Sequence, residues 1–132
     1  QEFSQRYAKS TNFETRECRL QDEKNRQNSI ETEDKELAEN WNMAQKRVIN
    51  AANEAYEWAL ENGIAKEQAR AVLPEGNTET TLYMSGTLRS WIHYCKLRRS
   101  NGTQKEHMII ADQCWEVLSQ HFPDVAKAVE EL

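Results

Sequence analysis

The stretch KELAENWNMAQKRVINAANEAYEWALEN, residues 35–62, decides the fold of this chain. Apolar residues recur in it at steps of three and four, which is the period of an amphipathic α-helix. They are Leu37, Trp41, Ala44, Val48, Ala52, Ala55, Tyr56 and Ala59. Either Thr32 or Asp34 can cap the start of the helix, and Gly63 suits a left-handed stop after its end. The chain is therefore expected to be organised around one long helix.

The sequence that follows predicts shorter elements. Residues 66–72 have a helical pattern that Pro74 ends, because the residue before a proline avoids the helical region. Residues 78–85 are rich in Thr, with Tyr and Leu, and favour a strand. Further helices are predicted over 87–99, 103–121 and 125–132, with Pro123 closing the second of these.

The N-terminal part is less regular. Residues 3–9 mix aromatic and polar residues and favour an extended segment, whereas residues 10–34 are polar with almost no apolar periodicity. We interpret 10–34 as a long loop, and such loops usually bind something or cover a neighbouring subunit. With 132 residues, the chain has the length of one domain. The prediction is a single α+β domain, mostly helical, over residues 1–132.

Several classes of protein are disfavoured by composition. No apolar run approaches the roughly 20 residues that cross a bilayer, and the start lacks the layout of a signal peptide, so we expect a cytoplasmic protein without membrane contact. The three cysteines show neither CxxC nor His/Cys spacing. No disulfide framework and no metal site are therefore expected.

The charge is unevenly distributed. The net charge of -5 argues against a broad nucleic-acid surface. Residues 31–39 hold five acids and one Lys, whereas residues 88–106 hold five Lys or Arg and one Glu. A local basic pocket on an acidic protein suits a small phosphorylated ligand. Because the chain has only four glycines and no glycine-rich phosphate loop, arginine side chains are expected to bind the phosphate.

Three residues of the predicted helix 87–99 are candidates for binding. Arg89 and Arg98 are nine residues apart, which places them about 180° from each other around a helix. His93 lies four residues after Arg89 and shares its face. One helix can thus present Arg89 and His93 to one ligand and Arg98 to another. The alternative is a helix whose charges are merely solvated.

Separated blocks of the sequence resemble the flavin-dependent thymidylate synthases. ARAVLP at 69–74 is followed by TLRSWIHYCKLR at 87–98 and TQKEH at 103–107, in the order of the family's C-terminal signature. Upstream, EFSQRY at 2–7 is similar to the end of the family's flavin motif, and RLQDEKNRQNS at 19–29 is similar to its polar loop. The resemblance covers most of the chain.

The sequence departs from the family pattern in a few places. Gln1 stands where Asn is usual, Asn28 where Gly is usual and Thr103 where Ala is common. The Arg-His-Arg part of the flavin motif would precede Gln1. We therefore expect the chain to be the C-terminal portion of such an enzyme, without a complete active site of its own.

The resemblance implies roles for particular residues. Arg98 would act in catalysis by holding the uracil ring of dUMP, where a fixed guanidinium can donate two parallel bonds. The other residues implied to bind dUMP are Glu2, Ser4, Gln5, Arg6 and Arg70. Those implied to face FAD are Thr87, Arg89 and His93, with Thr87 where the family often has Asn.

The function that the resemblance implies is the methylation of dUMP to dTMP with methylenetetrahydrofolate, FAD and NADPH, in a homotetramer whose active sites are shared between subunits. Two alternatives stay open. One is a truncated, inactive remnant that oligomerises or binds nucleotide. The other is a small nucleic-acid-binding module using Lys96, Arg98, Arg99 and Lys105, which the net charge disfavours.

Overall fold

The computed structural model describes residues 2, 4–9, 12–100 and 102–130. The parts of the predicted segments that fall on Phe3, Ser10, Thr11, Glu131 and Leu132 lie outside these residues, as does Gln1. The chain forms two compact units. Unit 1 comprises Gln1–Arg19 and Glu31–Met84, and unit 2 comprises Leu20–Ile30 and Ser85–Leu132. Two such units can belong to one domain, so the single-domain organisation stays a prediction.

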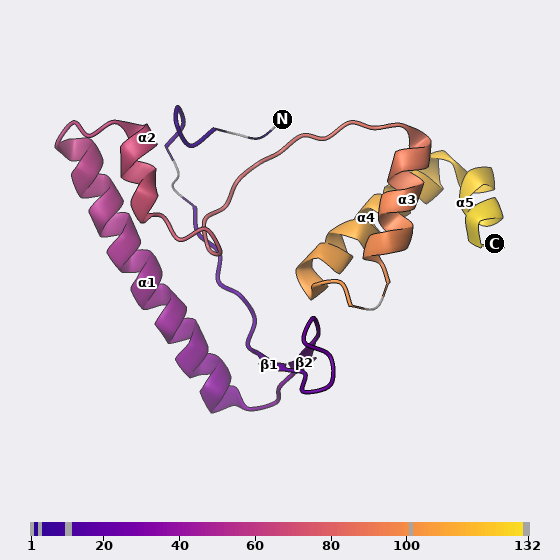
Figure 1. Cartoon of the computed structure of the whole chain (residues 1–132), viewed down its shortest axis with the longest axis horizontal. Coiled ribbons are helices and arrows are strands. Elements are labelled where there is room, and N and C mark those ends of the chain that lie inside the picture. The colour runs from indigo at the N-terminus through magenta and orange to yellow at the C-terminus, as the bar shows by residue number, and fades with distance from the viewer. Residues whose placement is uncertain (1, 3, 10–11, 101, 131–132) are drawn as a thin grey trace. The chain divides into compact units, whose positions relative to one another are not determined.

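The long helix is confirmed as α1, Lys35–Glu61 (Figure 1). Of the two possible caps, the structure uses Asp34, whose Oδ1 accepts the N–H of Leu37 at 2.9 Å. The expected stop is also present, because Gly63 has φ 76°, a conformation that glycine adopts without steric cost. Capping chemistry therefore fixes both ends of α1.

The core of unit 1 lies at the C-terminal end of α1. The predicted helix 66–72 is divided into α2, Lys66–Ala69, and a single 3-10 turn η1, Arg70–Val72. Tyr56 is fully buried and packs with Ala59 of α1 and Ala69 of α2. This cluster holds α2 and η1 against α1 and so fixes the position of Arg70, the first residue of η1.

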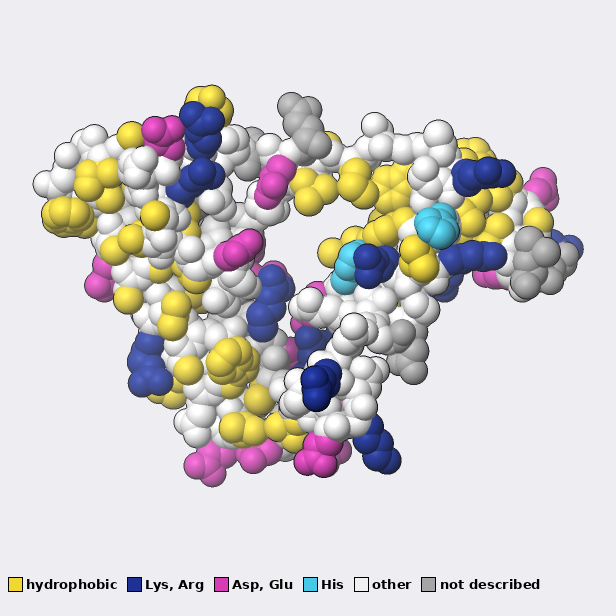
Figure 2. Space-filling model, in the orientation of Figure 1, with side chains coloured by type: hydrophobic (Ala, Val, Ile, Leu, Met, Phe, Trp, Pro, Cys, Tyr) yellow, Lys and Arg dark blue, Asp and Glu magenta, His cyan; other side chains and the backbone are white. Residues whose placement is uncertain are grey.

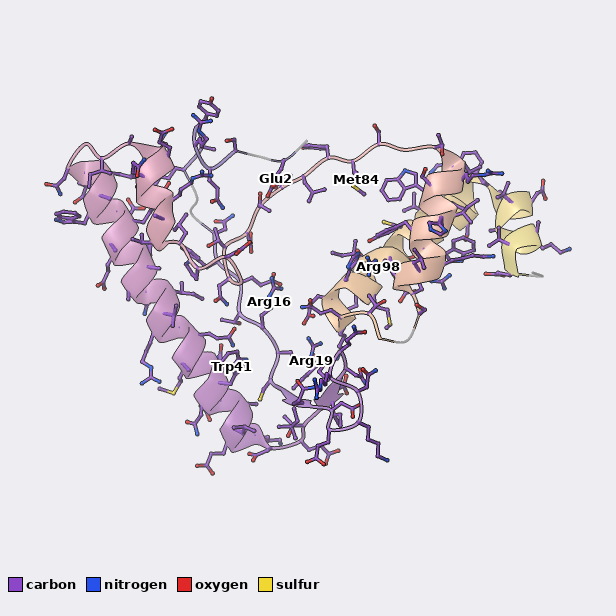
Figure 3. The ribbon with its side chains drawn as sticks, in the orientation of Figure 1. Glu2, Arg16, Arg19, Trp41, Met84 and Arg98 are labelled. Carbon is purple, nitrogen blue, oxygen red and sulfur yellow. The ribbon has the colours of Figure 1, made fainter. Side chains whose placement is uncertain are left out.

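The other half of α1 leaves much of its apolar stripe exposed. Leu37, Trp41 and Val48 are 41%, 43% and 53% exposed. The indole Nε1 of Trp41 donates to the carbonyl of Arg16 at 3.1 Å, which ties the preceding chain segment to the helix (Figure 3).

Two predictions for the extended segments of unit 1 are wrong. Residues 78–85 form no strand but only isolated antiparallel bridges, from Thr78 to Phe13 and from Leu82 to Glu2. Each bridge pairs with a different short segment, so no continuous ladder forms. Within 3–9, the backbone turns after Ser4, whose carbonyl accepts the N–H groups of Tyr7 and Ala8 at 3.1 and 3.0 Å.

The polar segment 10–34 contains a small hairpin that the sequence pattern did not indicate. Strands β1, Arg19–Gln21, and β2, Ser29–Glu31, form a two-stranded sheet. Asp22 organises the connection, because its carboxylate accepts the N–H groups of Lys24 and Asn25 at 2.8 and 3.2 Å. The bond from Lys24, together with those from the Asn28 side chain and the Asn25 N–H, holds the pKa of Asp22 below its ordinary value.

Unit 2 is built from three helices that follow the hairpin segment. They are α3, Leu88–Arg98; α4, Lys105–His121; and α5, Pro123–Glu130. Their core contains Cys95, Trp115, Leu118 and Ala126. Pro123 begins α5 rather than only closing α4, which suits a residue whose missing N–H is not needed in a first turn.

The structure confirms the mostly helical α+β class. Hydrophobic side chains gather over α3 and α4 on the visible face of unit 2 (Figure 2). None of the helices among the described residues is both long and apolar enough to span a membrane.

Candidate functional site

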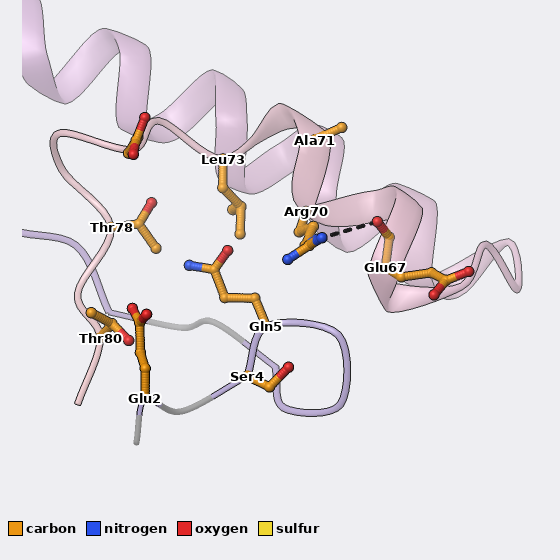
Figure 4. A pocket seen from close by; sticks show the side chains of 10 residues that line it. Glu2, Ser4, Gln5, Glu67, Arg70, Ala71, Leu73, Thr78 and Thr80 are labelled. Atoms are coloured by element: carbon orange, nitrogen blue, oxygen red, sulfur yellow. Dashed lines mark hydrogen bonds between the residues drawn. The ribbon is translucent and has the colours of Figure 1, made fainter. Parts of the chain in front are cut away.

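Unit 1 contains a pocket of about 730 Å³ beside α2 and η1 (Figure 4). Its lining comes from the N-terminal segment, from α2 and η1, and from the segment after Pro74. The lining residues are Glu2, Ser4, Gln5, Glu67, Arg70, Ala71, Leu73, Glu75, Thr78 and Thr80. Every one of these residues belongs to unit 1.

The pocket brings together four of the six residues predicted to bind dUMP: Glu2, Ser4, Gln5 and Arg70. Local structure explains how they meet. The bridge between Glu2 and Leu82 aligns the N-terminal segment with residues 78–82, and the turn after Ser4 folds that segment back. Segments that are more than 60 residues apart in sequence therefore face one cavity.

Among the described residues that line the pocket, Arg70 is the one with a guanidinium. Its Nε donates to the backbone carbonyl of Glu67 at 3.3 Å. It forms no ion pair with another residue that the structure describes, and the residue is exposed. A guanidinium with free donors at the edge of a cavity can bind a phosphate in a two-pronged arrangement.

Arg6 is not part of the lining. Its Nη2 forms an ion pair with Glu67 Oε2 at 3.2 Å, and its guanidinium lies 5.7 Å from the ring centre of Tyr7. Arg6 thus contacts the lining through Glu67 and through its backbone N–H, which donates to Ser4 Oγ at 3.4 Å.

Sequence analysis missed the acidic part of the pocket. Glu67 and Glu75 line it together with Glu2, so three carboxylates accompany the single Arg70. The missed signal was the spacing between Glu67 and Arg70, because residues three apart on a helix lie next to each other. The hydroxyl groups of Thr78 and Thr80 were likewise not anticipated.

The residues predicted to face FAD lie on α3 in unit 2. Thr87 is the N-cap, and its Oγ1 accepts the N–H of Ser90 at 3.2 Å. Arg89 and His93 are exposed and make no hydrogen bond or ion pair within the described part of the chain. Because α3 is an uninterrupted helix, they share a face as expected.

Arg98, the sixth predicted dUMP ligand, is the last residue of α3 and also exposed (Figure 3). It forms no ion pair with any residue in the described ranges. The next residue differs, because Arg99 Nε donates to Asp112 Oδ1 at 2.7 Å and its guanidinium lies 5.2 Å from the ring centre of Trp115. Of the two arginines, Arg99 is committed to packing α3 on α4, whereas Arg98 is available for a ligand.

A partly buried polar contact joins α3 and α4. Tyr94 Oη and His107 Nε2 lie 3.0 Å apart. Burial raises the pKa of the Tyr94 phenol, and it likewise raises the pKa of the Cys95 thiol. Both groups are therefore neutral at pH 7, which suits a packed helix interface.

A second pocket, of about 630 Å³, lies in unit 2 between α3 and α4. Its lining is mainly apolar and includes Leu88, Trp91, Ile110, Val117 and Phe122. None of the predicted site residues lines it. The residues predicted to bind polar ligands therefore lie in or beside the pocket of unit 1 and on exposed positions of α3.

Comparison with known proteins supports the family resemblance of the motif blocks. The family model for thymidylate synthase complementing protein, Thy1, matches residues 1–124. The chain belongs to this family. A probable flavin-dependent thymidylate synthase of Paramecium bursaria Chlorella virus 1 is 50% identical over 133 residues, which cover 98% of this chain and 60% of the relative.

A second member of the family is equally similar. The flavin-dependent thymidylate synthase of Synechocystis is 49% identical over 130 residues, again covering 98% of this chain and 60% of the relative. A shorter match, 39% identical over 61 residues, links the chain to the flavin-dependent thymidylate synthase of Corynebacterium efficiens and covers 46% of this chain and 24% of that protein. The chain thus spans about 60% of the length of its first two relatives.

Proposed function

We propose that this chain is part of a flavin-dependent thymidylate synthase and contributes residues that bind dUMP and FAD. One observation carries the proposal: Glu2, Ser4, Gln5 and Arg70, from two of the motif blocks, line one pocket. Family membership and the names of two relatives that match 98% of the chain support the same conclusion.

We assign the pocket of unit 1 to the phosphate and sugar of dUMP. Arg70 supplies a cation with free donors, and Ser4 and Gln5 supply neutral hydrogen-bonding groups. Glu2 and Thr80 can accept hydrogen bonds from a sugar hydroxyl or a base N–H. We assign Arg98 to the uracil ring, where a permanently charged guanidinium stabilises negative charge that develops on a carbonyl oxygen.

We assign Thr87, Arg89 and His93 to FAD. The side chains fit this role because Arg89 and His93 are exposed on one face of α3 and are held by no other described residue. A guanidinium and an imidazole at this spacing can bind a phosphate or ring oxygen of the cofactor. When bound, FAD supplies the redox chemistry of the reaction.

The wider assembly completes the proposal. Methylenetetrahydrofolate and NADPH are the proposed co-substrates of this methyltransferase, and a cytoplasmic homotetramer with shared active sites is the proposed assembly. In such an assembly, the ligands of one dUMP need not come from one chain. The inactive remnant that oligomerises or binds nucleotide is the second candidate, because the pocket of unit 1 by itself supports nucleotide binding.

The proposal is tested with a chimera in which this chain replaces the matching segment of the Synechocystis relative. We expect FAD-dependent formation of dTMP from dUMP, measured chromatographically with methylenetetrahydrofolate and NADPH present. Binding of dUMP without dTMP formation would favour the remnant. A folded chimera that neither binds dUMP nor forms dTMP would contradict both candidates.

A further inference from the structure

The ion pair between Arg6 and Glu67 lies at the edge of the pocket in unit 1. Glu67 lines the pocket, whereas Arg6 does not. Their side chains are 53% and 47% exposed, and Nη2 and Oε2 are 3.2 Å apart. Solvent screens such a pair, so its net attraction is weak. A phosphate, with two negative charges and several acceptor oxygens, competes well against one carboxylate for this guanidinium.

The charges of the lining determine how much a bound phosphate needs the guanidinium of Arg6. Three carboxylates, those of Glu2, Glu67 and Glu75, face one guanidinium, that of Arg70. A phosphate dianion entering this pocket meets more negative than positive charge. Arg6 is a further cation already bonded to a lining residue, but the carboxylate of Glu67 neutralises it.

Glu67 contacts the two arginines through different atoms. Its side-chain Oε2 pairs with Arg6, and its backbone carbonyl accepts from Arg70 Nε at 3.3 Å. The side chain can therefore release Arg6 without breaking the bond that orients Arg70. Both side chains are about half exposed, so surrounding packing holds neither of them in place.

We infer that Glu67 limits the affinity of the pocket for phosphorylated ligands: Arg6 exchanges the carboxylate of Glu67 for the phosphate of the bound nucleotide. This inference rests on the proposed function, because it takes dUMP as the ligand. In the free protein, Glu67 holds Arg6 in place and limits binding of other anions. In the complex, Arg6 and Arg70 together neutralise the phosphate.

The inference is tested by isothermal titration of this chain and of Glu67→Gln with dUMP, deoxyuridine and inorganic phosphate. Glutamine keeps the helix propensity and removes the competing charge. We expect Glu67→Gln to bind dUMP and inorganic phosphate about three- to fivefold more tightly, which is the scale of an exposed ion pair. Deoxyuridine, which has no phosphate, should bind both proteins equally.

Two control variants separate the exchange from a general change in charge. Glu57→Gln removes a carboxylate of unit 1 that pairs with Lys9 at 2.8 Å and lies outside the lining, so it should leave dUMP affinity unchanged. Glu75→Gln removes a lining carboxylate that pairs with no residue among those described, so its effect should be smaller than that of Glu67→Gln. Circular dichroism checks that each variant keeps the same helix content.

A double-mutant cycle gives the decisive result. If the higher dUMP affinity of Glu67→Gln depends on Arg6, the substitution should no longer tighten dUMP binding when Arg6→Gln is also present. Three results would overturn the exchange while leaving dUMP binding established. Glu67→Gln could raise dUMP affinity equally in the Arg6→Gln background, Glu75→Gln could raise it as much as Glu67→Gln, or Glu67→Gln could fail to raise it. The exchange would also be overturned if no variant binds dUMP. In that case, dTMP formation by the chimera tests the proposed function separately.

Discussion

Gln45 holds the backbone of Arg16 with both ends of its amide. Its Oε1 accepts the N–H of Arg16 at 2.7 Å, and its Nε2 donates to the carbonyl of Arg16 at 2.9 Å. Gln45 is the buried polar side chain of α1, and it also accepts from Asn77 Nδ2 at 3.3 Å. One amide therefore ties the N-terminal segment and the turn before Thr78 to α1, and both of these segments continue into the pocket.

Replacing this amide should loosen unit 1. We predict that Gln45→Leu costs about 1–3 kcal/mol of unfolding free energy, because the N–H of Arg16 loses its partner and the carbonyl of Arg16 keeps the bond from Trp41 but loses that from Gln45. Urea unfolding followed by circular dichroism measures the loss. Lys46→Ala, at the exposed neighbouring position, should change stability little. Equal stability of Gln45→Leu and the original chain would show that water replaces the amide without cost.

Thr87 has a structural role that can be measured apart from any flavin contact. Because Thr87 Oγ1 caps α3, Thr87→Ala should cost about 1 kcal/mol, whereas Thr87→Ser should preserve the cap. Thermal unfolding of both variants tests this. A similar loss in Thr87→Ser would indicate that the methyl group, not the hydroxyl, is what stabilises this end of α3.

The buried Cys95 makes the stability of unit 2 depend on pH. Burial raises the pKa of its thiol above the ordinary 9.0, so the folded state keeps the proton more tightly than the unfolded state. The resulting stability is complete below pH 9.0 and is lost as pH rises from there toward the folded pKa. Unfolding free energy should therefore fall above pH 9.0, and less steeply in Cys95→Ala.

Burial also predicts the order in which the three cysteines react with a thiol reagent. Cys95 has no exposed surface, whereas Cys18 and Cys114 are partly exposed. A thiol-specific disulfide reagent should modify Cys18 and Cys114 first, as followed by mass spectrometry of peptides. Early modification of Cys95 would contradict the closed packing of α3 on α4.

Two neighbouring arginines on α3 give a matched test of the proposed catalytic residue. In the chimera, Arg98→Lys keeps the charge but loses the planar guanidinium, so we predict a loss of at least about tenfold in dTMP turnover. Arg99→Lys should keep most of the turnover, because Arg99 is paired with Asp112. Near-normal turnover of Arg98→Lys would show that Arg98 is misassigned.

The helices could be predicted from the sequence, and the reason is local. The apolar period and the Asp34 and Gly63 signals act within a few residues, so α1 was predicted to within one residue at its end. The strand over 78–85 was wrong because pairing depends on distant partners, here Phe13 and Glu2. Threonine content favours extended backbone but does not supply a neighbouring strand.

The candidate site was predicted in part for a similar reason. Motif blocks identified Ser4 and Arg70, and the structure places both in one lining. The acids Glu67 and Glu75 were missed because no motif contained them. Their importance depends on the position of Arg6, which only the folded chain shows.

The central claim is that the pocket of unit 1 binds the phosphate of dUMP through Arg70. The most direct measurement is the dUMP affinity of Arg70→Gln, with Arg47→Gln on the exposed side of α1 as the control for charge. The account predicts that Arg70→Gln weakens dUMP binding at least about tenfold, the scale of a lost charge-assisted bond, and that deoxyuridine and the Arg47→Gln control are unaffected. Unchanged dUMP affinity in Arg70→Gln would contradict it.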